Sequence, residues 1–219
     1  MNQHDLSYQN DEIDDSGAWL SIGDLMSALL MIFALLMMVT LTQLSHQIQQ
    51  EKESRILIIK ALTDAMHAKE IDAKIDPQTG DVSIQDSLLF DQRDSKLKPD
   101  GVELLNRFIP VYSEVIFSNE TISKQVARLV IEGHTSSEGD YAYNMALSLD
   151  RAKNVLLRID SMTFPNKMQF LSKLMPAGRG EIDADQQSQL PSDRKVLFRF
   201  QLAGDSERFV RLLKDISDE

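Results

Sequence analysis

One segment of the chain gathers side chains that could recognise a small charged group. Residues 131–155 read IEGHTSSEGDYAYNMALSLDRAKNV, and their pattern favours a strand that ends near position 132 and a long helix over 140–159. Leu147 and Arg151 are four residues apart, so we expect them on one face of that helix. A guanidinium can hold a carboxylate through two parallel hydrogen bonds, which makes Arg151 a candidate partner for an acidic group.

The other candidate binding residues lie in the loop before this helix and in its first turns. The whole set is His134, Thr135, Ser136, Asn144, Leu147 and Arg151. Gly139 allows the loop to turn closely around a ligand, and Asn144 is placed to order that loop. Taken singly, the histidine would be an ordinary loop residue, and Arg151 would form a surface ion pair with Asp140 or Asp150. The joint spacing favours a binding site instead.

A second group that could do chemistry is a carboxylate at the start of an apolar run. Residues 25–41 read LMSALLMIFALLMMVTL without one charged side chain, and Asp24 directly precedes them. An ionisable group inside a membrane span costs roughly 2.5–3.5 kcal/mol on insertion scales, and so usually marks an ion pathway. The alternative is structural, because Ser21 and Asp24 have the spacing of a capping box and a carboxylate suits a helix N-terminus.

The apolar run is long enough to cross a membrane as one helix. Residues 19–44 supply about 25 positions, which at ~1.5 Å per residue exceed the ~30 Å hydrocarbon core of a bilayer. Trp19 stands at the entrance, where interfacial aromatic residues are common. A cleaved signal peptide fits poorly, because residues 1–18 carry five acidic side chains and no Lys or Arg, and no small-residue cleavage site follows the run.

Beyond the span, apolar residues continue at helical spacing. They are Leu41, Leu44, Ile48, Ile58 and Leu62, with Glu51 and Arg55 interrupting the pattern. We predict a linker helix within residues 45–80 that either pairs with a second copy of the chain or packs as a lone amphipathic helix on the next domain. Residues 76–80, which read DPQTG, are typical of a turn or linker.

The rest of the chain, residues 81–219, mixes strand and helix patterns and predicts an α+β domain, in which helices pack on one face of a mixed β-sheet. Strands are expected over 81–85, 127–132 and 195–202, and helices over 99–116, 140–159 and 206–216. Pro110 predicts a kink or break within the first of these helices. The segment 167–175 fits neither pattern clearly.

Composition excludes several classes of protein. The net charge of −11, from 23 basic and 34 acidic residues, argues against a nucleic-acid-binding protein, which needs a basic surface to neutralise phosphates. The chain has no cysteine, which excludes disulfides, thiolate catalysis, cysteine-based zinc sites and lipid anchors on cysteine. The four histidines form no catalytic or metal-binding set with their neighbours, so the sequence predicts neither an enzyme nor a metal site.

Residues 133–155 resemble the signature of OmpA-like peptidoglycan-binding domains, roughly GHTD-x-x-G-x-x-x-x-N-x-x-LS-x-x-RA-x-x-V. The matches in register are Gly133, His134, Thr135, Gly139, Asn144, Leu147, Ser148, Arg151, Ala152 and Val155. Residues 89–90 and 192–196 are similar to the opening and closing motifs of the family, so the resemblance covers about 81–202. It implies that the six candidate residues bind the peptide stems of peptidoglycan, whose diaminopimelate offers a carboxylate and an amine.

One position departs from this family pattern. Ser136 stands where the family has an aspartate, which in the family pairs with the ammonium group of the ligand. A hydroxyl accepts a hydrogen bond but brings no charge. Glu138 or Asp140, from the same loop, could supply the missing carboxylate, so the departure bears on ligand affinity more than on the fold.

The order of segments in the chain is similar to that of MotB-type stator subunits of ion-driven motors. Such subunits have a short tail, here residues 1–18, a single span, here opening with WLSIGDLMSALL, a linker helix and an OmpA-like domain. The resemblance implies that Asp24 binds and releases the transported ion, H⁺ or Na⁺, and that no cofactor is needed. It also implies a homodimer inside a ring of five multi-span MotA-like subunits.

The same resemblance implies a bacterial inner-membrane protein with its tail in the cytoplasm and its C-terminal domain in the periplasm. Lys52, Arg55 and Lys60 follow the span and favour the opposite orientation, although long domains translocate largely regardless of charge. The run DLMSALLM and the acidic tail look closer to the motor subunits of Zorya anti-phage systems than to flagellar ones. A flagellar stator and a passive tether between membrane and wall are the alternatives, and a tether does not need Asp24.

Overall fold

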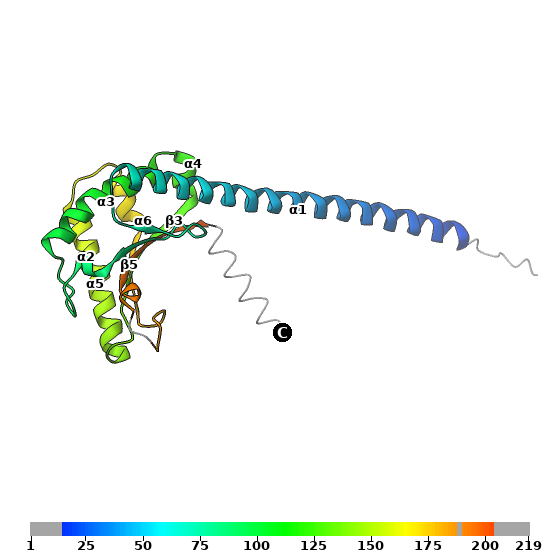
Figure 1. The fold of residues 1–219 in the computed structure, drawn as a ribbon. Helices are drawn as coiled ribbons and strands as arrows, with labels where there is room; N and C mark the ends of the chain where they lie inside the picture. Colours follow the sequence, from blue (N-terminus) through cyan, green and yellow to red (C-terminus); the bar gives the residue numbers. More distant parts are fainter. Residues whose placement is uncertain (1–14, 188–189, 204–219) are drawn as a thin grey trace, which may run out of the picture. The chain divides into compact units, whose positions relative to one another are not determined.

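The computed structural model describes residues 15–187 and 190–203, so the helix predicted over 206–216 lies outside the described residues. The chain divides into two compact units, residues 1–48 and 49–219. The described part of the N-terminal unit is the first part of helix α1 (Asp15–Ala68), drawn in blue in Figure 1. Leucine, methionine and alanine favour helices and dominate this part, and no proline interrupts it.

Apolar side chains of the N-terminal unit are exposed along the helix. Leu29, Leu30 and Phe33 each keep about two-thirds of their surface, at 68%, 68% and 65%. Helix α1 is long and apolar enough to cross a membrane, judged by length and composition. An exposed apolar surface of this extent is expected to face lipid or another membrane helix.

The extent of α1 bears on the capping interpretation of Ser21 and Asp24. The helix already includes Asp15, the first described residue, so Ser21 and Asp24 both lie inside it and cannot cap its N-terminus. The capping alternative is therefore wrong. The hydroxyl of Ser27 donates to the carbonyl oxygen of Gly23 at 2.7 Å, one turn earlier, as is usual within a helix. Asp24 is exposed on the surface of the helix.

A five-stranded mixed sheet organises the C-terminal unit. Its strands are β1 (Lys74–Ile75), β2 (Val82–Gln85), β3 (Val126–His134), β4 (Leu174–Gly180) and β5 (Lys195–Leu202). Across the sheet the order is β1-β2-β5-β3-β4, in which β3 and β4 are parallel and the other neighbours antiparallel. A parallel pair needs a crossover connection, and the helices between β3 and β4 supply it.

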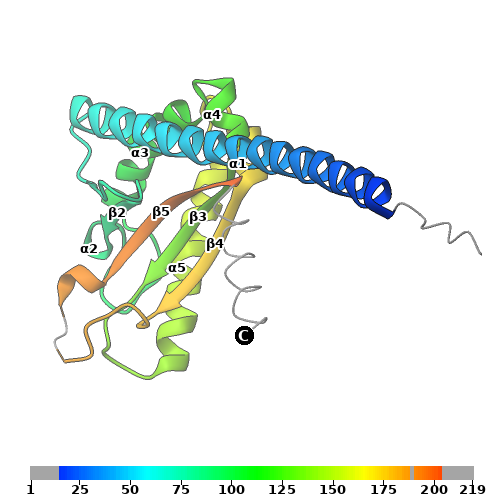
Figure 2. The ribbon, with the colours of Figure 1, turned by 90° about the vertical axis from the view of Figure 1, so that its right-hand side faces the viewer.

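Helices complete the predicted α+β architecture. They are α2 (Asp86–Leu89), α3 (Pro99–Phe117), α4 (Glu120–Gln125), α5 (Tyr141–Ser161) and α6 (Lys167–Lys173), with a 3₁₀ turn η1 (Pro191–Asp193). Helix α5 lies along β3 and β4 behind the sheet in Figure 2, and α3 contacts α5. The predicted fold class, a mixed sheet with packed helices that follows an apolar helix, is confirmed.

The last turns of α1 belong to the core of the C-terminal unit. Ile58, Leu62 and Met66 are at most 3% exposed and join the same hydrophobic cluster as Ile71. Of the two alternatives for the linker helix, packing on the adjoining domain is thus the observed one for these residues. The helix ends at Ala68, before the predicted limit at position 80, and β1 and the DPQTG turn occupy the remainder.

One local prediction needs correction, and one segment that was left open is assigned. Pro110 does not break α3, because Phe108 and Tyr112 on the same helix are buried, and this packing outweighs the missing N–H of proline. Residues 167–175, which fitted neither pattern, contain both elements, since α6 gives way to β4 at Leu174.

Helix α5 approaches the sheet at glycines. A Cβ atom on Gly133 would lie 2.0 Å from the carbonyl oxygen of Ser148, and one on Gly178 would lie 2.8 Å from the Ser148 hydroxyl. That hydroxyl accepts a hydrogen bond from the backbone N–H of Gly180 at 2.9 Å. These contacts define the position of α5 against the ends of β3 and β4.

Candidate functional site

A small pocket forms where the end of β3, the start of α5 and two loops converge. Its volume of about 30 Å³ suits one or two small polar groups. The pocket is lined by Gln92, Arg93, Thr135, Ser136, Glu138, Tyr143, Asn144, Leu147, Arg151 and Arg194. Five of the six predicted binding residues are therefore brought together here, all except His134.

Side chains from the first turns of α5 hold the loop in front of the pocket. Asp140 caps the helix by accepting a hydrogen bond from the backbone N–H of Tyr143 at 2.9 Å. Asn144 Nδ2 donates to the carbonyl oxygen of Glu138 at 3.1 Å and to the carboxylate of Glu181. Asn144 thus orders the loop as the sequence predicts. Since Asp140 serves as a cap, Glu138 is the loop carboxylate that lines the pocket.

Arg151 lies at the bottom of the pocket and is only 2% exposed. Its Nη2 is 3.1 Å from a carboxylate oxygen of Asp86, and its Nε donates to the carbonyl oxygen of Asp94 at 2.9 Å. The guanidinium also lies over the ring of Phe90, 5.3 Å from the ring centre. The surface ion pair with a nearby aspartate, considered from the sequence, is wrong, because the partner is a buried residue from a distant segment.

Burial governs the charges beneath the pocket. It raises the pKa of Asp86 to about 6, against the opposing effect of Arg151 and Arg194. The same burial lowers the pKa of Arg151, although Asp86 acts in the other direction. Oδ1 of Asp86 and the hydroxyl of Thr135 are buried without a hydrogen-bond partner. Because Thr135 lines the pocket, its hydroxyl remains available to a ligand.

The raised pKa of Asp86 predicts that stability depends on pH. A carboxyl that holds its proton more tightly in the folded chain stabilises the fold most at low pH, and this contribution is lost as the pH rises from about 4 to 6. The change in pKa from 3.8 to about 6 corresponds to on the order of 3 kcal/mol. Asp86→Asn should remove this dependence. Urea titrations of the C-terminal unit between pH 4 and 7 measure it.

The matched control for this prediction is Asp91→Asn, which removes an exposed carboxyl from the same region. The control should keep the pH dependence of the unchanged protein. Equal dependence in the Asp86 variant and in the unchanged protein would contradict the role assigned to burial.

Two arginines of the pocket were not among the predicted binding residues. Arg93 lies over the ring of Tyr143, 6.0 Å from its centre, and Arg194 directly precedes β5. Within the described ranges, neither guanidinium makes a hydrogen bond or a close ion pair. Arg194 belongs to the closing motif at 192–196. Because this motif is far from α5 in the sequence, the sequence alone did not indicate that Arg194 lines the same pocket as the α5 residues.

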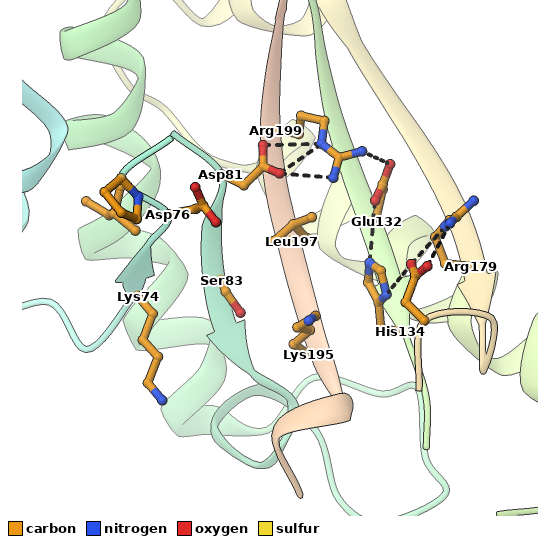
Figure 3. Close-up of a pocket in the computed structure, with 13 residues that line it drawn as sticks. Lys74, Asp76, Asp81, Ser83, Glu132, His134, Arg179, Lys195, Leu197 and Arg199 are labelled. Carbon is orange, nitrogen blue, oxygen red and sulfur yellow. Dashed lines mark hydrogen bonds and ion pairs between the residues drawn. The ribbon is translucent and has the colours of Figure 1, made fainter. Parts of the chain in front are cut away.

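His134 belongs to another pocket, on the opposite face of the sheet. Consecutive residues of an extended chain point to opposite sides, which separates His134 from Thr135. Figure 3 shows His134 beside Glu132 and Arg199 in a pocket of about 620 Å³. The six residues predicted as one site thus lie in two places.

Asp24 lies in the N-terminal unit and is the only Asp, Glu, Lys or Arg between positions 16 and 50. A carboxylate can bind and release a cation or a proton, and no neighbouring charge along this stretch of helix neutralises it. Over residues 15–187 and 190–203, no three His, Cys, Asp or Glu side chains gather in a way that could hold a metal ion.

Comparison with known proteins agrees with this architecture. Residues 89–196 match the OmpA family. The Zorya protein ZorB of Escherichia coli O139:H28 is 28% identical over 200 residues, which cover 85% of this chain and 80% of the relative. The Zorya protein ZorB of Escherichia coli strain Crooks is 33% identical over 165 residues, or 65% of this chain and 67% of the relative.

A solved structure shares the fold. A MotB-like protein from Desulfovibrio vulgaris superposes with a TM-score of 0.51 at 17% identity, over 70% of this chain and 94% of its own. The match to the OmpA family begins and ends at the motifs singled out in the sequence, at residues 89–90 and 192–196. Because the second relative is 33% identical over two-thirds of its own length, the chain belongs to the ZorB family, and its residues 89–196 match the OmpA family.

Proposed function

We propose that this chain is the peptidoglycan-anchored B subunit of an inner-membrane, ion-driven rotary motor, which works with a MotA-like partner in anti-phage defence. One observation supports the proposal above all others. The same chain joins a lone carboxylate near the start of an apolar helix to an arginine-lined pocket in an OmpA-family domain. Its relatives are Zorya proteins, which favours defence over flagellar torque.

The pocket suits the end of a peptide stem that carries a carboxylate and an ammonium group. Arg194 offers a guanidinium for the carboxylate, while Arg151 is committed to Asp86 and forms a positive floor. Glu138 lines the same pocket and is the proposed partner of the ammonium group, in place of the aspartate of the family pattern. Leu147 provides an apolar wall for the methylene groups between the two charges.

Asp24 is the proposed ion carrier. Loading with a proton or a sodium ion neutralises the carboxylate, and release restores its charge, so the helix alternately loses and regains an interaction with its partners. The membrane potential supplies about 2.3 kcal/mol per charge per 100 mV to drive this cycle. In the proposed assembly, two copies of the chain stand inside five MotA-like subunits. Rotation of that ring relative to the wall-bound dimer is the output.

The proposal places the N-terminal tail in the cytoplasm and the OmpA-family domain in the periplasm, because peptidoglycan lies only on that side. A passive tether would have the same topology and the same pocket. It would not need a carboxylate in the apolar helix, so the lone Asp24 favours the motor.

Binding to the cell wall is tested by co-sedimentation of the detergent-solubilised chain with purified peptidoglycan that contains diaminopimelate. The unchanged protein should sediment with the wall. Arg194→Gln should weaken binding roughly ten- to hundredfold, since a charge-assisted bidentate contact is worth about 1.5–3 kcal/mol. Leu147→Ala should weaken it less.

The control for charge is Arg128→Gln, which removes an exposed arginine of β3 that does not line the pocket. This variant should bind like the unchanged protein. If the unchanged chain stays in the supernatant, the pocket is not a wall-binding site and the anchoring role fails.

A further inference from the structure

The pocket that contains His134 holds a group of charged side chains linked across three strands. We call Glu132, His134, Arg179, Asp183 and Arg199 the histidine cluster. Arg199 on β5 pairs with Glu132 on β3 at 3.0 Å, and Arg179 on β4 pairs with Asp183 at 2.9 Å. Figure 3 shows the imidazole between Glu132 and Arg179.

The imidazole of His134 faces a carboxylate at each of its nitrogens. Nε2 is 3.4 Å from Glu132 and Nδ1 is 3.5 Å from Asp183, while the side chain is only 5% exposed. Nε2 is also buried without a hydrogen bond. A neutral imidazole has one N–H and one lone pair, so it can donate to only one of the two carboxylates. Only the doubly protonated ring can donate to both.

Both carboxylates stay charged where an imidazole titrates. Burial acts to raise the pKa of Glu132, but contacts with His134 and Arg199 outweigh it and hold the pKa below its usual range. The hydrogen bond from Arg179 lowers the pKa of Asp183. An imidazole ordinarily changes charge between about pH 5 and 8, where these carboxylates are ionised.

Other charged groups also face the histidine cluster. Lys195 on β5 lies opposite His134 on β3 in the strand register. The positive charges of Lys195, Arg179 and Arg199 disfavour a positive charge on the imidazole. Lys74, Asp76 and Asp81 line the same pocket from β1 and from the hairpin that joins it to β2. Asp81 forms an ion pair with Arg199 at 2.9 Å, and Asp76 accepts hydrogen bonds from the backbone of its own turn.

The loop after β4 connects the histidine cluster to the peptidoglycan pocket on the other face. Asp183 contacts His134, and Glu181, two residues earlier, contacts the amide of Asn144. That amide also holds the carbonyl oxygen of Glu138, which lines the peptidoglycan pocket. A change in the position of this loop should therefore also move Asn144 and Glu138, which line the peptidoglycan pocket.

We propose that His134 is a positioning residue whose protonation tightens the binding of peptidoglycan at the pocket on the other face of the sheet. The inference rests on the proposed wall-binding function. Protonation lets the ring donate to Glu132 and Asp183 together, which fastens the loop after β4 to the sheet. Asn144 and Glu138 are then held in place before the ligand arrives, so less ordering is needed on binding.

The first measurement is the affinity of the full chain, in detergent, for purified peptidoglycan at pH 5.5 and 7.5 and constant ionic strength. We expect roughly threefold to fivefold tighter binding at pH 5.5, the range that one partly exposed ion pair supplies. His134→Gln keeps a polar side chain without a titrating charge and should lose the part of the pH effect that His134 supplies. The comparison is made in the Asp86→Asn background, because Asp86 beneath the pocket also changes charge in this range. His67→Gln, an exposed histidine of α1, should keep the full pH effect.

Asp183→Asn provides a second test that does not touch the buried ring. Asp183 is half-exposed on its loop, so the fold should tolerate the change. This variant should also lose most of the pH effect. Leu147→Ala, in contrast, should weaken binding by the same factor at both pH values, because it alters the ligand contact and not the cluster.

Hydrogen–deuterium exchange without peptidoglycan separates this inference from the proposed function. Exchange of the segment 181–187, normalised to the same segment in His134→Gln, should be slower at pH 5.5 than at 7.5. If the exchange of this segment responds to pH in the same way in the unchanged protein and in His134→Gln, the inference is overturned, whether or not the chain binds the wall. Slower exchange with no sedimentation at either pH would refute the wall-binding function alone. Slower exchange with wall affinity independent of pH would overturn the coupling between the two faces.

Discussion

We expect that replacing Asp24 with asparagine abolishes protection against phage, while membrane insertion and the proposed self-association and assembly with a MotA-like partner remain intact. Asparagine has nearly the same shape as aspartate, but it cannot bind and release an ion by changing its charge. Asp24 is the only ionisable side chain between positions 16 and 45, so no neighbour in the apolar run can substitute for it. The measurement is plaque formation on cells that carry the complete gene set, with the chain or its variant.

Two further variants make this result specific. Asp24→Glu keeps a carboxylate and should retain part of the activity, whereas Asp64→Asn removes an exposed carboxylate from the C-terminal unit and should retain all of it. Full protection by the Asp24→Asn variant would exclude ion carriage by this residue. It would leave the passive tether as the better interpretation.

Removing residues 1–80 should prevent the OmpA-family domain from folding, whereas removing residues 1–48 should not. The shorter fragment lacks Ile58, Leu62, Met66 and Ile71, four buried members of the core. Replacing one such side chain by alanine costs about 2–5 kcal/mol, and a whole domain is stable by only about 5–15 kcal/mol. Circular dichroism and amide NMR spectra of the two fragments would show the difference.

Single substitutions in the longer fragment give the same prediction on a finer scale. Leu62→Ala should lower the free energy of unfolding by about 2–5 kcal/mol, because the side chain is 0% exposed. Leu57→Ala, at a position that is 58% exposed, should change it by less than about 0.5 kcal/mol. A folded fragment 81–219, or equal effects of the two substitutions, would show that the end of α1 is not part of the core.

Much of the binding pocket could be predicted because its residues are close in sequence. Thr135, Ser136, Asn144, Leu147 and Arg151 fall within one strand end, one loop and one helix, so helical spacing is enough to bring them together. The strand over 195–202 could be predicted equally well, since its apolar and polar residues alternate regularly.

The partners of Arg151 could not be predicted in this way. Asp86 and Asp94 come from segments about 57 to 65 residues away, and only the folded domain brings them to the guanidinium. A sequence motif records which residue types recur at fixed spacing, but it does not record which charges a buried group meets. The choice of Arg151 as the carboxylate ligand stays a prediction, and its ion pair with Asp86 could not be foreseen from the sequence.

The position of His134 was within reach of sequence reasoning. The strand pattern extends to this residue, and alternation along a strand places His134 and Thr135 on opposite faces. Strand β1 could not be predicted from the sequence, because two residues are too few to show an alternating pattern. The end of the linker helix was missed for a related reason, since no proline or glycine marks Ala68 and the helix ends where the chain turns into β1.

The close contact between Gly133 and Ser148 limits how this protein can diversify. Even one added methyl group at position 133 would overlap a backbone oxygen, at 2.0 Å, so any side chain there would force helix α5 away from the sheet. In the proposed wall-binding function, recognition of altered stem peptides would change through the surrounding pocket residues, such as Gln92, Arg93, Glu138 and Arg194. Sequence variation among relatives should therefore concentrate at those loop positions, while glycine persists at 133 across bacteria with different walls.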